Sequence, residues 1–519
     1  MIRIDGKVYQ VNDEIDFKLD ITENREKNVY LYKKDVTFKL SGKNAQVFLL
    51  CSFNKVYELS VEKSIYIKRF IKNNIVKEAM SVDNIYLCRN KFTNLIKFNN
   101  EYYIFNLLYK TIDIIPEHLY KHLKNDNFDN INDNILNYMI SRRYIEPTNF
   151  NNKEKIYIKD TECITVYMVF SYICNLKCVY CFENKVNQIQ EMSNEVFNES
   201  IKMLKNISKD KKVILVLYGG EPLLSNNYVR IKEVVEIFKE NQNIFFRIIT
   251  NGVNAKEFIP IFKEIRDRVI EFVITLDGLK RIHNERRMFK DGRETFDIIC
   301  TSIYEILKFN IRVKIRINID YNNIYSQDEL VAFLEDKFGF KNIILEYNLV
   351  EQNNKNDYEN PGLLNLYKVC SNLIKNSKLE IQINYPIWYY ISNFHTNRNK
   401  KPILLNSPCM IGNGFVIDND GKLYHCNEGM KEKKFLAGEL NENGFKFTNY
   451  FLENEECQKC YMYILCYGGC ERKKINNNNN KLAYCKYKEY EGILKQAILQ
   501  QSFGVINKML EISEGIEWI

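Results

Sequence analysis

Short apolar runs alternate with amphipathic patterns through the middle of the chain, between residues 164 and 350. The runs are rich in Val, Ile and Phe, which is typical of buried parallel strands. The stretches between them place apolar residues at helical spacing. In chain order, the runs are ITVYMVFS, VILVLYGG, FFRIITNG, VIEFVITLDG, RVKIRINID and NIILEYNLV. Six β/α units in series predict an α/β fold in which a parallel sheet forms a partial (β/α)6 TIM-like barrel.

Cysteine, glycine and polar residues follow the ends of these predicted strands. Cys174 comes after the first run, Gly-Gly-Glu-Pro (219–222) after the second, Thr-Asn-Gly (250–252) after the third and Thr-Leu-Asp-Gly (275–278) after the fourth. In barrels of this kind the chemistry gathers at the carboxyl ends of the strands. The pattern therefore predicts a functional site at this edge, where we expect Asp277 to serve the turn after its strand.

Residues 1 to about 155 show a different pattern. KNVYLYKKDVTFKL predicts two β segments, and NLIKFNNEYYIFNLL predicts a hairpin that turns at Asn99 and Asn100. Helical patterns occur in KNAQVFLLCSF, KSIYIKRFIKNN, PEHLYKHLK and NINDNILNYMISRRYI. The order of these elements predicts a small α+β region with winged-helix-like units.

Composition places the chain among globular proteins. Of its 519 residues, 45% are hydrophobic and 27% are charged. No uninterrupted run of about 18 apolar residues occurs, so no membrane span and no membrane partner are expected. The start, MIRIDGKVYQVNDE, lacks the apolar region of a secretory signal, which predicts a cytoplasmic location.

The formal net charge of +8 comes from 74 Lys and Arg against 66 Asp and Glu. The excess is spread along the chain. No compact basic stripe with interleaved aromatic residues stands out, so no nucleic-acid partner is expected.

The distribution of the 15 cysteines indicates metal binding. In a reducing cytosol, cysteines are thiols or metal ligands rather than disulfides. Two groups are clustered, one of three cysteines in CNLKCVYC (174–181) and one of seven between Cys409 and Cys485. The scattered cysteines, which we expect to be packing residues, are Cys51, Cys88, Cys163, Cys300 and Cys370.

The C-x3-C-x2-C spacing of Cys174, Cys178 and Cys181 supplies three ligands, where a tetrahedral metal site or a [4Fe–4S] cube needs four. Taken alone, the spacing suits either an iron–sulfur cube with one open iron or a zinc site that takes its fourth ligand from elsewhere.

With its context, this group resembles the radical S-adenosylmethionine (SAM) superfamily over about residues 164–350. The motifs that carry the resemblance are C174-NLK-C178-VY-C181, YGGEP at 218–222, TNG at 250–252 and TLDGLKRIHNERRMFKDGRETFD at 275–297. The resemblance implies that SAM fills the open corner of a catalytic [4Fe–4S] cluster. The reduced cluster would then cleave SAM, and a 5′-deoxyadenosyl radical would abstract a hydrogen atom from the substrate.

The resemblance also implies contacts with SAM. Tyr180 would contact the adenine, and a threonine, Thr275, stands where the family usually has the serine that binds the ribose. Arg287 matches the arginine that pairs with the SAM carboxylate, for which a guanidinium is well suited. The edge that receives the methionyl amino group would be formed by Gly219, Gly220 and Glu221.

The second group of cysteines resembles the seven-cysteine SPASM extension of radical SAM enzymes, and its alternative interpretation is one or two zinc ribbons. The resemblance implies two auxiliary [4Fe–4S] clusters. The first would be bound by Cys409, Cys426 and Cys470, and the second by Cys457, Cys460, Cys466 and Cys485. Some relatives add a fourth cysteine to the first cluster, but MIGNGFVID contains none. That cluster would therefore have an open iron or take another ligand such as Cys370.

The N-terminal region resembles the recognition elements of ribosomal-peptide maturases, which bind a leader peptide by adding it as a strand to a sheet edge. A plain packing domain is the alternative. Together, the resemblances imply a thioether-forming maturase of the sactipeptide or ranthipeptide type, which joins a cysteine sulfur to carbon. Its partners would be a precursor peptide with its leader and an electron donor of the flavodoxin or ferredoxin type.

These patterns and resemblances divide the chain into six predicted segments. They are a peptide-recognition domain (1–90), a second small α+β segment (91–160), a radical SAM core (161–350), a bridging region (351–400), a SPASM domain (401–495) and a C-terminal helix (496–519).

Other functions suit the same motifs. An anaerobic sulfatase-maturing enzyme, which generates formylglycine, would share the core and the second cysteine group. Another peptide-modifying radical SAM enzyme, forming carbon–carbon crosslinks or epimerising residues, would do so too. The alternative from a different class is a non-enzymatic zinc- or nucleic-acid-binding protein.

Overall fold

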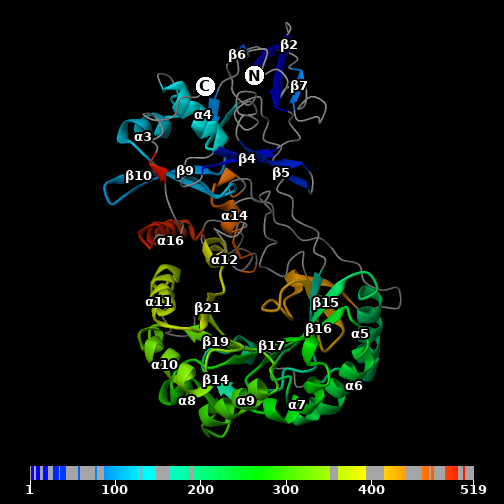
Figure 1. Cartoon of the computed structure of the whole chain (residues 1–519). Coiled ribbons are helices and arrows are strands. Elements are labelled where there is room, and N and C mark those ends of the chain that lie inside the picture. The colour runs from blue at the N-terminus through cyan, green and yellow to red at the C-terminus, as the bar shows by residue number, and fades with distance from the viewer. Residues whose placement is uncertain are drawn as a thin grey trace.

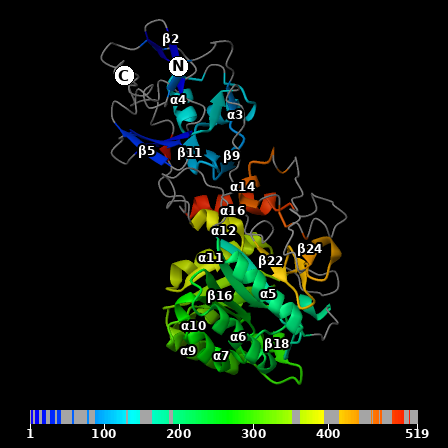
Figure 2. The same cartoon turned by 90° about the vertical axis from the view of Figure 1, so that its right-hand side faces the viewer.

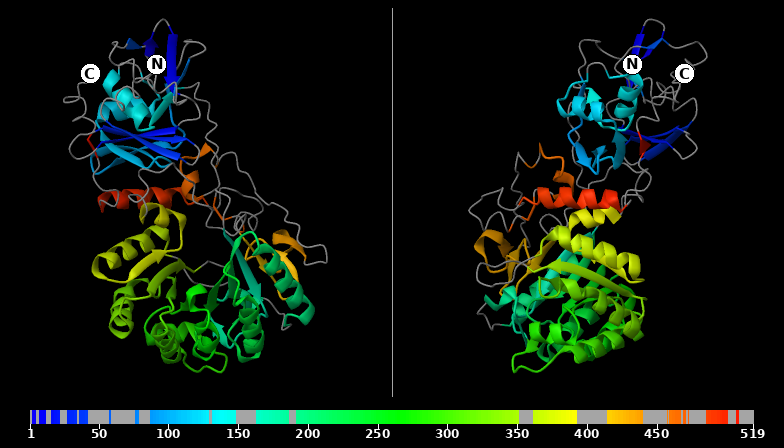
Figure 3. Two further views of the ribbon diagram at one scale, coloured as in Figure 1. Left: turned by 45° about the vertical axis from the view of Figure 1, so that its right-hand side comes forward. Right: turned by 90° about the vertical axis from the view of Figure 1, so that its left-hand side faces the viewer.

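The structure of the chain is a computed structural model, shown in Figures 1, 2 and 3. The residues that it describes are 2–4, 7–11, 16–21, 27–33, 36–41, 57–58, 76–78, 87–128, 131–147, 163–185, 191–350, 361–392, 414–439, 457, 459–466, 469–470, 472, 485–500 and 507–508. Cys51, Cys409 and the helices predicted in KNAQVFLLCSF and KSIYIKRFIKNN lie outside these residues.

A parallel sheet forms the centre of the protein, as the sequence predicts. Its strands pair in parallel in the order in which they follow along the chain. They are β13 (Cys163–Val169), β15 (Lys212–Tyr218), β16 (Ile244–Thr250), β17 (Val269–Thr275), β19 (Val313–Ile319), β20 (Ile343–Leu349) and β21 (Glu380–Ile383). The α/β class is therefore confirmed.

Helices cover the outer side of this curved sheet (Figure 1). They are α5 (Asn194–Ile207), α6 (Tyr228–Phe238), α7 (Ala255–Lys263), α8 (Lys280–Arg286), α9 (Phe296–Lys308), α10 (Gln327–Phe338) and α11 (Leu363–Asn376). Apolar residues of alternate strand positions, such as Ile248, Phe272 and Ile315, are fully buried in the core beneath them. The intervening positions of β16 and β19 are half-buried and face the inner, concave side.

A C-terminal segment extends the sheet beyond β13. Strand β22 (Gly414–Ile417) pairs in parallel with β13, and β23 (Lys422–Tyr424) and β24 (Leu436–Glu439) follow in antiparallel pairing. At Gly414 the two backbones approach so closely that an added Cβ would lie 2.1 Å from the Thr165 carbonyl oxygen. This contact holds the segment that follows the core against its first strand.

Among its described residues, the N-terminal region contains three sheets of three or four strands. The first holds β6 (Tyr57–Glu58), β1 (Ile2–Ile4), β2 (Lys7–Val11) and β7 (Val76–Glu78), and the second holds β3 (Asp16–Ile21), β4 (Lys27–Lys33) and β5 (Val36–Ser41). The third holds β25 (Asn507–Lys508), β11 (Thr111–Ile115), β10 (Glu101–Asn106) and β9 (Thr93–Phe98). The hairpin predicted at Asn99 and Asn100 is confirmed, and both residues have positive φ, which asparagine tolerates.

Two helices and a short strand pair complete this region, with α3 (Glu117–Lys124), α4 (Asp133–Ser141), β8 (Leu87–Arg89) and β12 (Ile145–Pro147). Asp113 is fully buried and accepts hydrogen bonds from Tyr138 and Tyr144. Its other partner is Arg142, whose Nε lies 3.0 Å from its carboxylate. The region thus has an ion pair and hydrogen bonds buried in its interior.

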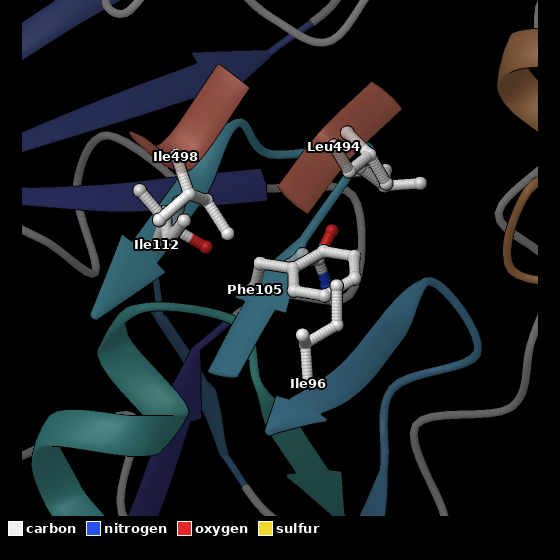
Figure 4. A pocket seen from close by; sticks show the side chains of 8 residues that line it. Ile96, Phe105, Ile112, Leu494 and Ile498 are labelled. Carbon is white, nitrogen blue, oxygen red and sulfur yellow. The ribbon is translucent and has the colours of Figure 1, made fainter. Parts of the chain in front are cut away.

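The C-terminal part differs from the helix predicted over 496–519. Helix α16 runs from Tyr487 to Leu499, and residues 507–508 form β25, which pairs with β11. Apolar side chains of α16 face the third sheet across a small pocket (Figure 4), lined in part by Ile96, Phe105, Ile112, Leu494 and Ile498. Two short helices, α12 (Pro386–Ser392) and α14 (Tyr463–Cys466), lie in contact with each other beside it. Within the described residues, no helix has the length and apolar character needed to cross a membrane.

Candidate iron–sulfur and SAM site

The loop with the first cysteine group follows β13, at the carboxyl edge of the sheet. A short strand, β14 (Leu176–Cys178), pairs antiparallel with β18 (Arg287–Phe289), so that Cys178 stands opposite Arg287. Cys178 is buried, and Cys174 and Cys181 are half-buried. The structure therefore brings a predicted SAM ligand, Arg287, to the predicted cluster ligands.

The surroundings of these thiols disfavour a free thiolate. Burial, followed by the charge of Glu221, raises the pKa of Cys174 to about 12. Burial also raises the pKa of Cys178, although the Arg287 guanidinium opposes this. Within the described residues, no three His, Cys, Asp or Glu side chains converge on one metal ion. In a cube each thiolate binds a different iron, and three thiolates are the donor type that such a cluster requires.

The glycines of the YGGEP motif (218–222) allow the loop after β15 to lie directly against the cysteine loop. Gly219 and Gly220 have φ of +86° and +49°. A Cβ on Gly220 would lie 2.3 Å from the carbonyl oxygen of Ile173, the residue before Cys174. The Glu221 amide donates to this same oxygen at 2.9 Å. Only glycine permits this approach, which leaves a narrow backbone edge beside the cysteines.

The Glu221 side chain joins the YGGEP motif (218–222) to the TNG motif (250–252). One carboxylate oxygen accepts hydrogen bonds from the Thr250 hydroxyl (2.6 Å) and the Leu223 amide (2.9 Å), and the other accepts from the Asn251 amide (2.6 Å). Asn251 in turn donates to the Asn175 side chain at 2.8 Å. Glu221 thus orders the loops around the cysteines, a role that the sequence analysis did not identify.

Tyr180 belongs to a buried polar network. Its hydroxyl donates to Asp277 and accepts from Arg287 Nη1 (2.8 Å) and the Asn318 side chain (3.1 Å). Arg286 lies over the Tyr180 ring, with its guanidinium carbon 5.0 Å from the ring centroid. The hydroxyl is therefore occupied within the protein, and the predicted adenine contact would involve the ring.

Two residues of this network, Arg286 and Asp320, were missed by sequence reasoning. Arg286 Nε lies 3.3 Å from Asp277, and its Nη1 pairs with Asp320. Asp277 also accepts from the Asn318 amide at 2.9 Å, so both of its oxygens are engaged. The expectation that Asp277 has a structural role agrees with these bonds. The only sequence signal was the adjacency of Arg286 to Arg287.

Arg287 carries an unused donor. The residue is 7% exposed, its Nη1 donates to Tyr180, and its buried Nε has no hydrogen-bond partner among the residues that the structure describes. Leaving a buried guanidinium donor unpaired is costly. The position therefore suits an anionic group such as the carboxylate of SAM. Thr275, at the end of β17, is buried at the same edge of the sheet.

The second cysteine group lies on the C-terminal segment. Cys426 follows β23, Cys457 and Cys460 precede α14, Cys466 ends α14, and both Cys470 and Cys485 are exposed. Burial raises the pKa of Cys460, and the charge of Cys485 adds to this rise. Cys409 is outside the described residues. Cys370 is fully buried in α11, the environment of a packing residue.

Comparison with known proteins identifies the core. Residues 168–336 match the family model of the Radical SAM superfamily. A cysteine-type anaerobic sulfatase-maturating enzyme of Clostridium perfringens (strain 13 / Type A) is 25% identical over 355 residues, which cover 61% of this chain and 92% of that relative.

Among solved structures, anSMEcpe with bound AdoMet aligns with a TM-score of 0.53 and 20% identity, covering 66% of this chain and 98% of that one. Streptococcus suis SuiB bound to S-adenosylmethionine aligns with a TM-score of 0.49 and 14% identity, and the alignment covers 91% of this chain and 98% of that one.

The matched residues, 168–336, form the central region of the chain, and the match supports a radical SAM enzyme. The superfamily implies SAM and a SAM-binding [4Fe–4S] cluster as cofactors.

Proposed function

We propose that this enzyme is a peptide maturase that forms a thioether between a cysteine sulfur and a carbon of a ribosomally made precursor. The observation that carries the proposal is the convergence of the Cys174–Cys181 loop, the Gly219–Gly220 edge and the unpaired Nε of Arg287. When bound, the cluster and SAM would supply an adenosyl radical that removes a hydrogen atom from the substrate.

The chain's own residues would bind and orient these cofactors. Cys174, Cys178 and Cys181 would hold three irons, and Arg287 would pair with the SAM carboxylate through a charge-assisted hydrogen bond. The backbone edge at Gly219 and Gly220, ordered by Glu221, would receive the amino group. We assign the ribose hydrogen bond to Thr275 and the adenine contact to the Tyr180 ring.

The second cysteine group would hold two auxiliary clusters in a SPASM domain, within the domain boundaries predicted above. Cys409, Cys426 and Cys470 would bind the first, and Cys457, Cys460, Cys466 and Cys485 the second. Such clusters, if bound, would supply an iron site for a substrate thiolate and an acceptor for the electron that thioether formation releases. A flavodoxin- or ferredoxin-type protein would supply the reducing electron.

The peptide class of the substrate is supported by the relatives. The C. perfringens enzyme is named for maturating sulfatases of the cysteine type, and the alignment spans 92% of its length. The residues before the core would add leader-peptide recognition in the cytosol. Their third sheet ends in the edge strand β9, a place where a leader could pair as an added strand.

Formylglycine generation in a sulfatase is the second candidate, favoured by the extent of that alignment. The two reactions differ in the fate of sulfur. A thioether keeps the cysteine sulfur and loses two hydrogens per crosslink, whereas formylglycine formation expels the sulfur.

The test is an anaerobic reaction of the reconstituted protein with SAM, reductant and a cysteine-bearing precursor, followed by mass spectrometry. A crosslinked product that retains all sulfur supports the maturase. A product that has lost sulfur supports the second candidate. Absence of SAM cleavage, with zinc and no sulfide in the anaerobically purified protein, would contradict both enzymatic functions and favour the zinc-binding alternative.

A further inference from the structure

A row of charged residues crosses the concave face of the parallel sheet, and none of them is among the predicted cluster ligands or SAM contacts. We call it the charged belt. In register, Arg247 of β16 stands beside Glu271 of β17, and Arg316 of β19 stands beside Glu346 of β20. Lys314, two residues before Arg316, completes the set. Three of its four strands, β16, β17 and β19, also carry residues of the candidate site near their carboxyl ends, namely Thr250, Thr275 and Asn318.

The belt is a continuous chain of ion pairs. Arg247 Nε lies 2.8 Å from Glu271, and Arg316 Nη2 lies 2.9 Å from Glu346. Lys314 Nζ bridges the two carboxylates at 3.3 Å from each. Three cations thus share two carboxylates, and the belt carries an excess of positive charge.

The two arginines differ from the rest of the belt in exposure. The side chains of Glu271, Glu346 and Lys314 are 3%, 6% and 13% exposed, whereas those of Arg247 and Arg316 are 27% and 28% exposed. The carboxylates are therefore covered, whereas the two arginine side chains are partly exposed.

Both arginines keep donors available. Among the described residues, hydrogen bonds engage Nε of Arg247 and both Nε and Nη2 of Arg316. Within the part of the chain that the structure describes, the two Nη atoms of Arg247 and Nη1 of Arg316 make no hydrogen bond. Burying an ion network inside a sheet is seldom the most stable choice, since apolar side chains of similar size do as well or better. This favours a binding role over a purely structural one.

We propose that Arg247 and Arg316 bind a carboxylate of the peptide substrate on the concave face of the sheet. This inference rests on the proposed function and adds the substrate's chemistry, which is an acidic side chain or a C-terminal carboxylate. Paired guanidinium groups suit a carboxylate because they offer forked donors. Glu271 and Glu346 orient the two arginines, and Lys314 neutralises the carboxylates beneath them.

The test measures peptide binding by ligand-observed NMR on the cluster-reconstituted full chain with SAM. Three synthetic heptapeptides, each with one cysteine, serve as probes. The first has a glutamate and blocked ends, the second has glutamine in its place, and the third has glutamine and a free C-terminal carboxylate. We expect at least one acidic peptide to bind about tenfold more tightly than the neutral peptide, the ratio typical of one charge-assisted contact. The comparison of the two acidic peptides identifies the source of the carboxylate.

Variants test whether the charged belt causes the tighter binding of acidic peptides. Arg247→Gln and Arg316→Gln should each bring the ratio close to one, whereas Arg281→Gln, on an exposed helical arginine, should leave it unchanged. Because Arg316→Gln weakens the pairing of a buried carboxylate and could prevent folding, Glu346→Gln provides a second test. It frees the Arg316 guanidinium and should increase the preference for acid.

Equal binding of all three peptides by the wild type, or binding of none, overturns the inference. So does a ratio that survives both arginine variants, or loss of SAM binding in Arg316→Gln with an unchanged peptide ratio. Formation of 5′-deoxyadenosine is measured separately. If no 5′-deoxyadenosine forms but acidic peptides still bind more tightly, the proposed function is wrong and the assignment of the charged belt is retained. If 5′-deoxyadenosine forms but acidic peptides do not bind more tightly, the assignment of the charged belt is wrong and the proposed function is retained.

Discussion

Replacement of Gly220 by alanine tests whether the close approach of two loops builds the cofactor site. Gly220 has φ of +49°, and an added Cβ would lie 2.3 Å from the Ile173 carbonyl oxygen and 2.6 Å from the Tyr172 carbonyl carbon. The left-handed conformation costs an L residue roughly 1–2 kcal/mol. The clash is with backbone, which cannot rotate away, and overpacking adds about 1–3 kcal/mol.

Gly292→Ala is the matched control. Gly292 also has positive φ, +88°, but an added Cβ there meets nothing within 4 Å. Both variants place an L residue at positive φ, so the difference between them reports chiefly the clash, about 1–3 kcal/mol.

The assay compares thermal unfolding of the two variants with their iron and sulfide content after anaerobic reconstitution. We expect Gly220→Ala to unfold at a lower temperature than Gly292→Ala by several degrees. It should also lose cluster or SAM binding, because the cysteine loop must move away from the displaced Cβ. Equal unfolding temperatures and equal SAM affinity in the two variants would refute the reasoning.

Three further predictions concern the site and the N-terminal region. Arg287→Gln should weaken SAM binding about 10- to 100-fold by calorimetry, since it removes a charged hydrogen-bond donor, while iron content stays at the wild-type level; unchanged affinity would contradict the assignment. Cys178→Ala should lower the iron bound per chain, whereas Cys300→Ala, at a buried packing position, should not, and equal iron in both variants would contradict the cluster assignment. Asp113→Asn leaves a buried guanidinium without its counter-ion and should destabilise the N-terminal region by about 3 kcal/mol in denaturant unfolding; a change below about 1 kcal/mol would argue against a buried pair.

The parallel core was predictable because each of its strands and helices has a recognisable pattern within its own stretch of sequence. Each strand is a short run of Val, Ile and Phe, and each connection has its own amphipathic pattern. The hairpin at Asn99 and Asn100 was predictable for a similar reason, since two consecutive asparagines accept the positive φ that the turn requires.

Pairings between distant segments were not predictable. Strand β22 joins the core beside β13, and β25 pairs with β11, although each pair is separated by hundreds of residues along the chain. Nothing in the four residues of β22 specifies a partner, because the pairing depends on tertiary contacts such as the one at Gly414.

In the candidate site, too, the residues of contiguous motifs were predictable and the contacts between distant residues were not. Cys174, Cys178, Cys181 and the glycines belong to contiguous motifs, which a single sequence displays. The partners of Tyr180 and the members of the charged belt come from separate strands. Their side chains meet only through the register of the sheet, which spacing along the chain does not contain.

The central claim is that the cluster held by Cys174, Cys178 and Cys181 has an iron to which SAM binds. Electron paramagnetic resonance of the reduced, anaerobically reconstituted protein, recorded with and without SAM, tests it most directly. The account predicts that SAM shifts one cluster signal, and that this signal and its response are absent when the three cysteines are replaced by alanine. A spectrum that SAM leaves unchanged, or a response that survives the triple replacement, would contradict it.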